Sequence, residues 1–516
     1  MTKHWNWLLA FVALVSLLGA TIGVALDRES SVEAYNAVWP TENVTYNIYA
    51  TDGYMNLADG TTIYTYGFIG GRSTDNLTYL STTAKGVSTL VATGAPTPAP
   101  TAGPVAVGEA ALVGNAQVPG PVIFAAVGDI VRINFKNLGV SNKNAPNDPH
   151  TIHLHGIDGD AANDGVPETS AAGIPANSAL PGAGNVITYY FYAETPGTYM
   201  YHCHQEADIH VQMGMYGALV VYNRADPAYL NGGPGKGFGG NLWGFTYDRD
   251  VIMLLTEVDV RQHLSEQNGL GGGAAFNPVN YQPQYWLING LSFPNTIHAD
   301  TLGLVWANWI AAHPNYDPFL TGSVSGGTRL LLRVINLGFE TQPMHVHGFH
   351  PKIIGSDQRQ WTWAQPNGAT PGFGLEKNTF TVGSGETYEL MFYFSTHNAT
   401  AQYRTAQSWY PAGTYSRWTG GKVLTPVLNT ATGSPQIPDP LLLPPNNLYR
   451  GGGPAGVAGF AVGGVVGLPS TVAPNLGGTP WFDQYQFFPF HNHDDYKATN
   501  NGVYPGGQFT MVRLDP

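Results

Sequence analysis

The chain has 516 residues, of which 43% are hydrophobic, enough to bury more than one core because single cores stop growing near roughly 250–300 residues. Only 11% are charged, while 65 glycines and 38 prolines favour a turn-rich β protein and disfavour a disordered chain. The net charge of −13 argues against a nucleic-acid partner, and the single cysteine excludes an internal disulfide and a four-cysteine zinc site.

Residues 1–26 are predicted to be a signal peptide or a membrane anchor. Lys3 precedes an almost unbroken apolar run from Trp7 to Leu26, and the small-x-small sequence Gly23-Val24-Ala25 lies near the end of that run. This order is typical of an export signal, and a run of this length would also span a bilayer. We therefore expect the folded part to be exported, to the periplasm or the extracellular space, either free or anchored to a membrane.

Short runs rich in Val, Ile, Tyr, Phe and Thr follow, separated by Gly, Pro, Asn and Asp. They include Val44–Tyr49, Thr61–Phe68, Ile130–Phe135, Val186–Tyr192 and Ala218–Tyr222. No long stretch has the 3.6-residue apolar period of a helix, so the pattern predicts β-sandwiches or barrels.

The order of features along the chain is repeated. Residues 129–139 and 328–338 each read as a strand that ends in Asn-Leu-Gly, and each precedes a group of histidines. The repeat predicts two duplicated domains, residues 40–230 and 245–516, and the second contains a Gly/Pro-rich insertion at 403–480.

Four His-x-His pairs occupy matching places in the two halves. In a strand, residues i and i+2 point to the same face, so each pair presents two imidazoles side by side. Such a concentration of imidazoles indicates metal binding, to copper, zinc, iron or nickel. The pairs are His153 and His155, His202 and His204, His345 and His347, and His491 and His493.

Cys203 lies inside one of these pairs and narrows the choice of metal. One thiolate, two imidazoles and a weak axial thioether form the trigonal site of a blue, electron-transferring copper. Met213 competes for the axial place, but the favoured ligand set is His150, Cys203, His210 and Met215.

The second half lacks a soft copper ligand at each corresponding place. It has Gln342 in place of His150, and it has Asn492, Thr499 and Tyr504 where the first half has Cys203, His210 and Met215. We therefore expect one blue copper, in the first half, and one shared cluster of eight histidines.

With this pattern the sequence resembles the multicopper oxidases, from about Val44 to Leu514 apart from the insertion. Family-like segments at 115–123, 128–132 and 286–294 add to the resemblance. It implies an all-β fold of two cupredoxin-like Greek-key sandwich or barrel domains, beside the N-terminal hydrophobic helix. It also implies four coppers per chain, with the blue type 1 copper and half of a trinuclear site in the first domain and the other half in the second.

The resemblance assigns the eight paired histidines to that trinuclear cluster. His153 and His345 are the implied ligands of its type 2 copper. The implied ligands of the type 3 pair are His155, His202, His204, His347, His491 and His493.

The N-terminal position of the blue copper resembles the smaller two-domain members of the family. These assemble as homotrimers whose trinuclear sites lie between subunits. One departure is that two more residues than usual separate Cys203 from His210. The implied activity is laccase-like: one-electron oxidation of a phenol, an amine or a low-valent metal ion, coupled to four-electron reduction of O2 to water.

Several carboxylates have two interpretations. Asp158 and Asp164 are candidate proton donors for O2 reduction, or turn-forming residues of a Gly/Asn-rich loop. Glu206 and Asp208 could bind Fe(II), Mn(II) or Cu(I) or steer cationic organic molecules, or they could form an ordinary acidic loop.

Three other functions fit parts of this pattern. A copper nitrite reductase shares the duplicated domains and an N-terminal blue copper, but its catalytic copper needs only three histidines. Four coppers per chain would support the oxidase and two the nitrite reductase. A non-catalytic cupredoxin electron carrier leaves the paired histidines of the second half without a purpose, and a structural surface protein explains only the insertion.

Overall fold

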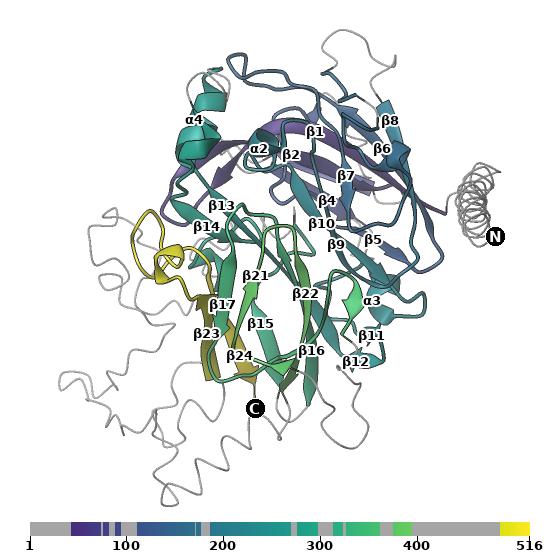
Figure 1. Cartoon of the computed structure of the whole chain (residues 1–516), viewed down its shortest axis with the longest axis vertical. Coiled ribbons are helices and arrows are strands. Elements are labelled where there is room, and N and C mark those ends of the chain that lie inside the picture. Colours follow the sequence, from purple (N-terminus) through teal and green to yellow (C-terminus); the bar gives the residue numbers. More distant parts are fainter. Residues whose placement is uncertain are drawn as a thin grey trace, which may run out of the picture. The chain divides into compact units, whose positions relative to one another are not determined.

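The computed structural model describes residues 43–73, 76–81, 88–93, 111–170, 172–176, 186–269, 276–297, 313–323, 327–361, 375–394 and 486–515. Strands dominate this part of the chain, as the composition predicts (Figure 1). The N-terminal segment 1–26 and the insertion 403–480 lie outside it. Among the residues described, no helix has the length and hydropathy needed to cross a bilayer.

The first half forms two four-stranded sheets. One has the order β2 (Thr62–Arg72), β1 (Val44–Asn56), β6 (Ile130–Asn137), β8 (Val186–Tyr192). The other has the order β5 (Ile123–Ala126), β10 (Tyr216–Tyr222), β9 (Gly197–His202), β7 (His153–His155). A separate hairpin joins β3 (Asn76–Ser81) to β4 (Ser88–Thr93). The five predicted strands of the first half are confirmed within a residue or two at most ends.

The second half also forms two sheets. The larger follows the order β14 (Tyr285–Ile288), β13 (Arg249–Val258), β16 (Thr328–Asn336), β22 (Thr387–Phe394), β18 (Lys352–Ser356), β19 (Arg359–Gln360), with β20 (Leu375–Glu376) paired to β18. The smaller follows the order β15 (Leu320–Ser323), β24 (Phe509–Asp515), β23 (Gln486–Asn492), β17 (Gln342–Val346), β21 (Thr379–Val382). A short ribbon pairs β11 (Gly240–Leu242) with β12 (Phe245–Tyr247).

The pairing of strands repeats between the halves. β1 runs parallel to β6, which pairs antiparallel with β8, just as β13 runs parallel to β16, which pairs antiparallel with β22. β9 lies between β7 and β10 as β23 lies between β17 and β24. The repeat seen in the sequence therefore has a counterpart in the strand pairing.

Helices are short and lie between strands. Those described are α2 (Ala207–His210), α3 (Pro227–Leu230) and α4 (Val260–Gln267), with 3₁₀ turns η2 (Ala161–Asn163), η3 (Pro278–Asn280), η4 (Asn295–Ile297) and η9 (Asp495–Lys497).

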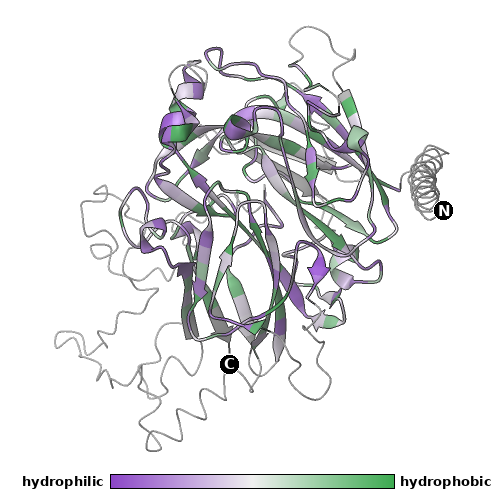
Figure 2. Cartoon of the chain, in the orientation of Figure 1, coloured by the Kyte–Doolittle hydropathy of each residue, from purple (hydrophilic) through white to green (hydrophobic). Residues whose placement is uncertain are grey.

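Residues 44–516 form one compact unit because the two halves share a hydrophobic cluster. Alternate side chains of a strand point to opposite faces. On β10, Leu219 and Val221 therefore pack into the core of the first half, while Val220 packs into the shared cluster. β13 behaves likewise, with Met253 in the core of the second half and Leu254 in the shared cluster. Figure 2 shows hydrophobic residues along these strands.

A buried ion pair lies next to the shared cluster. Arg333 of β16 is 1% exposed, and its guanidinium donates to Asp250 Oδ2 at 2.8 Å and to Thr198 Oγ1 of β9 at 3.2 Å. It also lies over the ring of Tyr222, 5.0 Å from the centroid. Glu389 of β22 faces Arg333 across the sheet and accepts a hydrogen bond from Thr198 N at 2.9 Å. Buried charges require such partners, so this network connects the halves at fixed positions.

Candidate metal centre

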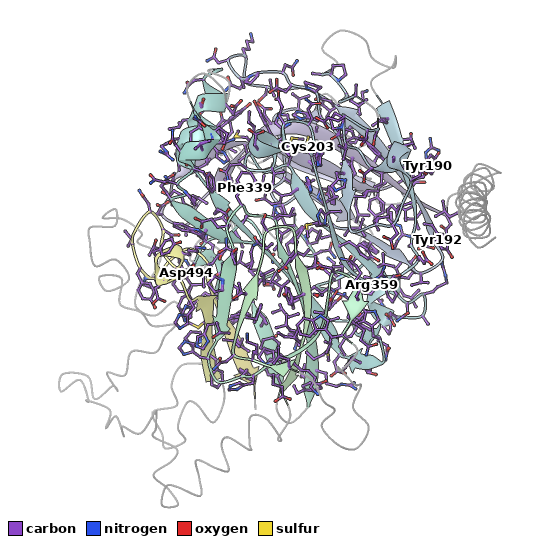
Figure 3. The ribbon with its side chains drawn as sticks, viewed as in Figure 1. Tyr190, Tyr192, Cys203, Phe339, Arg359 and Asp494 are labelled. Carbon is purple, nitrogen blue, oxygen red and sulfur yellow. The ribbon has the colours of Figure 1, made fainter. Side chains whose placement is uncertain are left out.

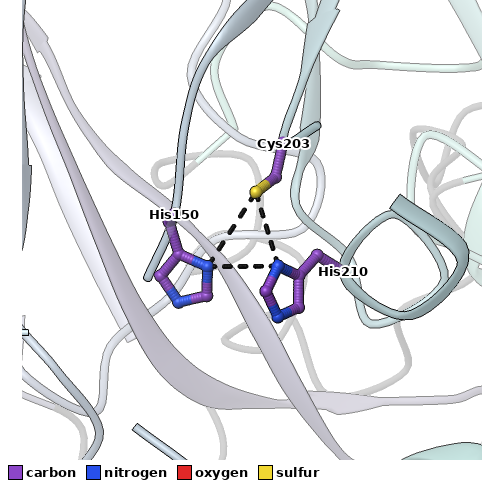
Figure 4. Close-up of side chains that lie close together, drawn as sticks. All are labelled: His150, Cys203 and His210. Carbon is purple, nitrogen blue, oxygen red and sulfur yellow. Dashed lines mark hydrogen bonds between the residues drawn. The ribbon is translucent and has the colours of Figure 1, made fainter. Parts of the chain in front are cut away.

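Three donor atoms meet in a buried pocket at the end of β9. Cys203 Sγ lies 3.4 Å from His210 Nδ1 and 3.9 Å from His150 Nδ1, and the two ring nitrogens are 3.3 Å apart (Figure 4). All three side chains are buried. Figure 3 places Cys203 among the strands of the first half.

Local backbone structure explains how distant residues form this pocket. The loop after Cys203 contains a single helical turn, α2, which ends at His210. This turn accommodates the two residues by which the loop exceeds the usual spacing. The chain then turns back, because Met215 N donates to His210 O and Cys203 N donates to Met215 O, both at 3.0 Å. His150 is held in place by two backbone hydrogen bonds that it exchanges with Ile174.

The electrostatics of the pocket favour a bound cation. Burial lowers the pKa of His150 well below its usual range. At His210, burial also lowers the pKa, but the facing Cys203 and Asp148 outweigh it and raise that pKa to about 10. Surroundings that stabilise a proton on His210 would also stabilise a bound cation, so the sulfur and the two imidazoles fit a copper ion.

Both candidate thioethers are buried in the same core cluster as Cys203. The backbone hydrogen bond from Cys203 N to Met215 O places these two residues side by side, whereas the Met213 carbonyl accepts from Tyr66 N at 3.0 Å. This pairing favours Met215, and the identity of the axial ligand stays a prediction.

The paired histidines form two compact clusters, one in each half. Strand register places His153 opposite His202, and His345 opposite His491. In the first cluster, the ring centroid of His153 is 5.1 Å from that of His202, 5.2 Å from that of His204 and 5.6 Å from that of His155. In the second cluster, the ring centroid of His345 is 4.8 Å from that of His347, 5.1 Å from that of His493 and 5.7 Å from that of His491.

One member of each pair is anchored in the same way. The Nδ1 atoms of His153, His345, His202 and His491 each lie within 2.9 Å of a backbone carbonyl oxygen. A ring that donates from Nδ1 keeps its lone pair on Nε2, which is the arrangement of metal-binding histidines. Burial also lowers the pKa of His202 to about 3, so this ring is neutral near pH 7. In the second cluster, His347 Nε2 and His491 Nε2 converge at 3.2 Å. Both clusters therefore fit copper.

The two clusters do not meet in one chain. All eight histidines are described, and the ring contacts among them join members of the same half. His347 and His493 are exposed. The structure thus brings each predicted set of four together but leaves the sets apart within a single subunit.

The two candidate proton donors differ in their surroundings. The Asp164 carbonyl oxygen lies 2.7 Å from His153 Nδ1, and one carboxylate oxygen lies 3.3 Å from that nitrogen. Asp158 instead forms an ion pair with Arg359 at 3.1 Å, with side chains that are 81% and 65% exposed. Asp164 is therefore placed to orient His153, and a proton role for either aspartate stays a prediction.

In the second half, a hydrogen-bonded amide network occupies the place equivalent to the cysteine pocket. Asn492 Nδ2 donates to Gln342 Oε1 at 2.6 Å and to Gln508 Oε1 at 2.8 Å, and Gln342 Nε2 donates to Glu257 Oε2 at 2.9 Å. The Tyr504 side chain is 53% exposed. The sequence identified Gln342 and Asn492 as replacements, but it gave no signal for Glu257, 85 residues from Gln342, or for Gln508, 16 residues beyond Asn492.

Comparisons with known proteins find similarity to copper oxidases. Two multicopper oxidase family models match residues 101–226 and 306–410. Copper resistance protein A of Escherichia coli is 29% identical over 143 residues, which is 28% of this chain and 18% of that protein. Putative laccase-9 of Oryza sativa subsp. japonica is 27% identical over 252 residues, 48% of this chain and 34% of that protein. L-ascorbate oxidase of Cucumis sativus is 29% identical over 178 residues, 34% of this chain and 25% of that protein.

The chain therefore spans at most about a third of the length of these three relatives. Among solved structures, blue copper oxidase from Nitrosomonas europaea has 18% identity and a TM-score of 0.48, with 91% of this chain and 85% of that chain covered. Each half of the chain matches a multicopper oxidase domain, and the chain belongs to the multicopper oxidase family.

Proposed function

We propose that the protein couples one-electron oxidation of a reductant, at a type 1 copper, to four-electron reduction of O2 to water at a trinuclear copper cluster. The observation that carries this proposal is the position of Cys203. Its side chain faces His150 and His210, while its chain neighbours His202 and His204 belong to the first histidine cluster.

The chain itself would contribute ligands, geometry and a path. Bound copper would supply the redox chemistry, as is general for such cofactors. Cys203, with His150, His210 and Met215, would hold the type 1 ion. The backbone on either side of Cys203 is then a short covalent route to His202 and His204. The carbonyls that bond Nδ1 of His153 and His202 would hold these rings with Nε2 toward the cluster.

We further propose that the complete trinuclear site forms between subunits of a homotrimer. Support comes from the two separate half-sites: each has four histidines, and exposed members of the second, His347 and His493, are available to a neighbouring subunit. Each chain of the trimer would then account for four coppers. We also propose that residues 1–26 direct export, as a signal peptide or as a membrane anchor.

Copper content, visible spectrum and oxygen uptake test the reaction together. The copper-loaded protein should contain four coppers per chain, absorb as a blue copper protein, and consume O2 with phenols or Fe(II). Two coppers per chain with nitrite reduction would refute the oxidase and support a nitrite reductase.

Mixing variants tests the location of the cluster. A chain with His153→Ala and His155→Ala keeps only the second half-site, and a chain with His491→Ala and His493→Ala keeps only the first. Co-expression should restore O2 reduction if the site lies between subunits, because one interface then joins two intact half-sites. A mixture of two variants that both lack the first half-site is the control and should stay inactive. No recovery in the first mixture would contradict the intersubunit site.

A further inference from the structure

We propose that Glu257 is a positioning residue for the second histidine cluster, which it holds in place through Gln342 and Asn492. The inference rests on the proposed function, because this cluster is half of the proposed trinuclear site. It goes further because it gives a role to a buried carboxylate that is not itself a proposed copper ligand.

Hydrogen-bond donors surround the Glu257 carboxylate. This side chain of β13 is 2% exposed. Its Oε1 accepts from Tyr281 Oη and Glu340 N, both at 3.0 Å, and from Phe339 N. Its Oε2 accepts from Gln342 Nε2 at 2.9 Å. An ionised carboxylate is purely an acceptor, so it satisfies all of these donors at once.

The order of donors and acceptors is fixed at both ends of the amide network. At one end, Gln508 Nε2 donates to two backbone carbonyl oxygens at 3.2 Å, which turns its Oε1 toward Asn492. At the other end, the Glu257 carboxylate accepts from Gln342 Nε2, which turns Gln342 Oε1 toward Asn492. Asn492 Nδ2 can therefore donate to both glutamine oxygens, at 2.6 and 2.8 Å.

Asn492 lies between the two histidines of the fourth pair. His491 Nδ1 lies 2.9 Å from Asn492 O, and Asn492 Oδ1 accepts from Asp494 N at 2.9 Å. His493 N donates to the carbonyl oxygen of Pro343, the residue after the glutamine of the network, at 2.7 Å. A change in Asn492 would therefore move the carbonyl that orients His491 and the backbone that bears His493. Such outer partners set the ring orientation of metal-binding histidines.

Glu257 also connects this cluster with the first half. Gln212 lies in the loop between His210 and Met215 and is 6% exposed. Its Nε2 donates to Glu257 O at 2.6 Å and to Tyr281 Oη at 3.2 Å, and Tyr281 in turn donates to the Glu257 carboxylate. The second cluster is therefore positioned relative to the loop that bears two of the predicted type 1 ligands of the same chain.

Glu257→Gln tests the role through copper content. Its carboxamide would place a donor against Gln342 Nε2, so the order of donors and acceptors toward Asn492 would break. Burial raises the pKa of Glu257 to about 7, so the measurement belongs at pH 8. In chelator competition followed by metal analysis, the trinuclear coppers should be held at least about tenfold more weakly than in wild type. The blue absorption should remain, since the ligands of the Cys203 pocket are unchanged.

A compensating substitution tests the donor order itself. Gln342→Glu alone would place two carboxylates against each other and should also weaken the binding of the trinuclear coppers. Combined with Glu257→Gln, it puts an acceptor between two amide donors and restores the order. The double variant should therefore recover most of the lost copper affinity, a departure from additivity expected of directly paired residues.

Placement in mixed assemblies separates this role from a general effect on the fold. In the mixture of half-site variants, the chain with His153→Ala and His155→Ala supplies the second half-site. Adding Glu257→Gln to this chain should lower O2 reduction at least about tenfold. Adding it to the chain with His491→Ala and His493→Ala should leave the rate within about twofold, because the second half-site of that chain is already removed.

Glu376→Gln is the matched control, because Glu376 is an exposed glutamate of β20 outside the network. It should leave copper affinity and O2 reduction unchanged in either chain. Equal losses from Glu257→Gln in both placements, or no loss in either, would overturn the inference.

Failure of this inference can be told from failure of the proposed function. Recovery of O2 reduction in the mixture, with both placements of Glu257→Gln alike, refutes the positioning role and leaves the oxidase intact. If the mixture recovers no activity, copper content decides: unchanged affinity for the trinuclear coppers in Glu257→Gln refutes the inference, and a tenfold loss with rescue by the double variant supports it. Absence of the blue absorption and of oxygen uptake with every donor refutes the oxidase, and the positioning role with it.

Discussion

Replacing Glu389 with glutamine should remove part of the pH dependence of stability. Glu389 is fully buried on β22, where one carboxylate oxygen accepts from Thr198 N and the other has no hydrogen-bond partner. Burial raises its pKa from the ordinary value of 4.5 to about 7, although the Thr198 hydrogen bond and Arg333 act in the opposite direction. The folded protein therefore keeps a proton that the unfolded chain has already lost.

The sign and size of the effect follow from that pKa. Because the folded state binds more protons between the two pKa values, the free energy of unfolding falls as pH rises through this window. The pKa change is worth about 3 kcal/mol in total, of which about 2.5 kcal/mol falls between pH 5 and pH 8. Glutamine does not titrate. The free energy of unfolding of Glu389→Gln should therefore rise by about that amount relative to that of the wild type as pH goes from 5 to 8.

Urea denaturation at equal protein concentration, at several pH values from 5 to 8, measures this difference. Glu194→Gln is the control, because Glu194 is exposed and its replacement should leave the pH dependence unchanged. Parallel curves for wild type and Glu389→Gln would refute the reasoning, since they would mean that Glu389 has the same pKa in both states.

Further substitutions test separate parts of the structure. Cys203→Ser should abolish the blue absorption and lower the copper content by one per chain, as checked by visible spectroscopy and metal analysis. Met215→Leu should raise the reduction potential of the blue copper, whereas an equal rise in Met213→Leu alone would identify Met213 as the axial ligand. Asp158→Asn should slow O2 reduction but not blue-copper reduction in stopped-flow measurements, and wild-type rates for both steps would remove its proton role. Leu332→Ala, in the fully buried middle of β16, should cost about 2–5 kcal/mol in chemical denaturation, and a smaller loss would show that the core can collapse around it.

The location of the strands and the grouping of the histidines within each half could be predicted from the sequence because both follow from short-range patterns. Runs rich in Val, Ile, Tyr, Phe and Thr predicted β6 and β8, and the i, i+2 spacing predicted that His153 and His155 lie on one face. The unlike residues at matching places, such as Asn492 for Cys203, indicated a different site in the second half, and hydrogen-bonded amides lie there.

Partners brought together by long-range packing could not be predicted in this way. Glu257 lies on β13, 85 residues from Gln342, and no local pattern distinguishes it from any other glutamate of a strand. The amide network of Gln342, Asn492 and Gln508 likewise exists only because strands from separate segments pair.

The sequence by itself thus identified which side chains are candidate metal ligands, because ligand type and spacing are local properties of the chain. The tertiary structure decided which of them meet. It placed Cys203 between His150 and His210, kept the two histidine clusters apart within one subunit, and buried Arg333 against Asp250 between the halves. The physical reason is that burial and polar pairing depend on how sheets from distant segments pack, and a local sequence pattern carries no record of that packing.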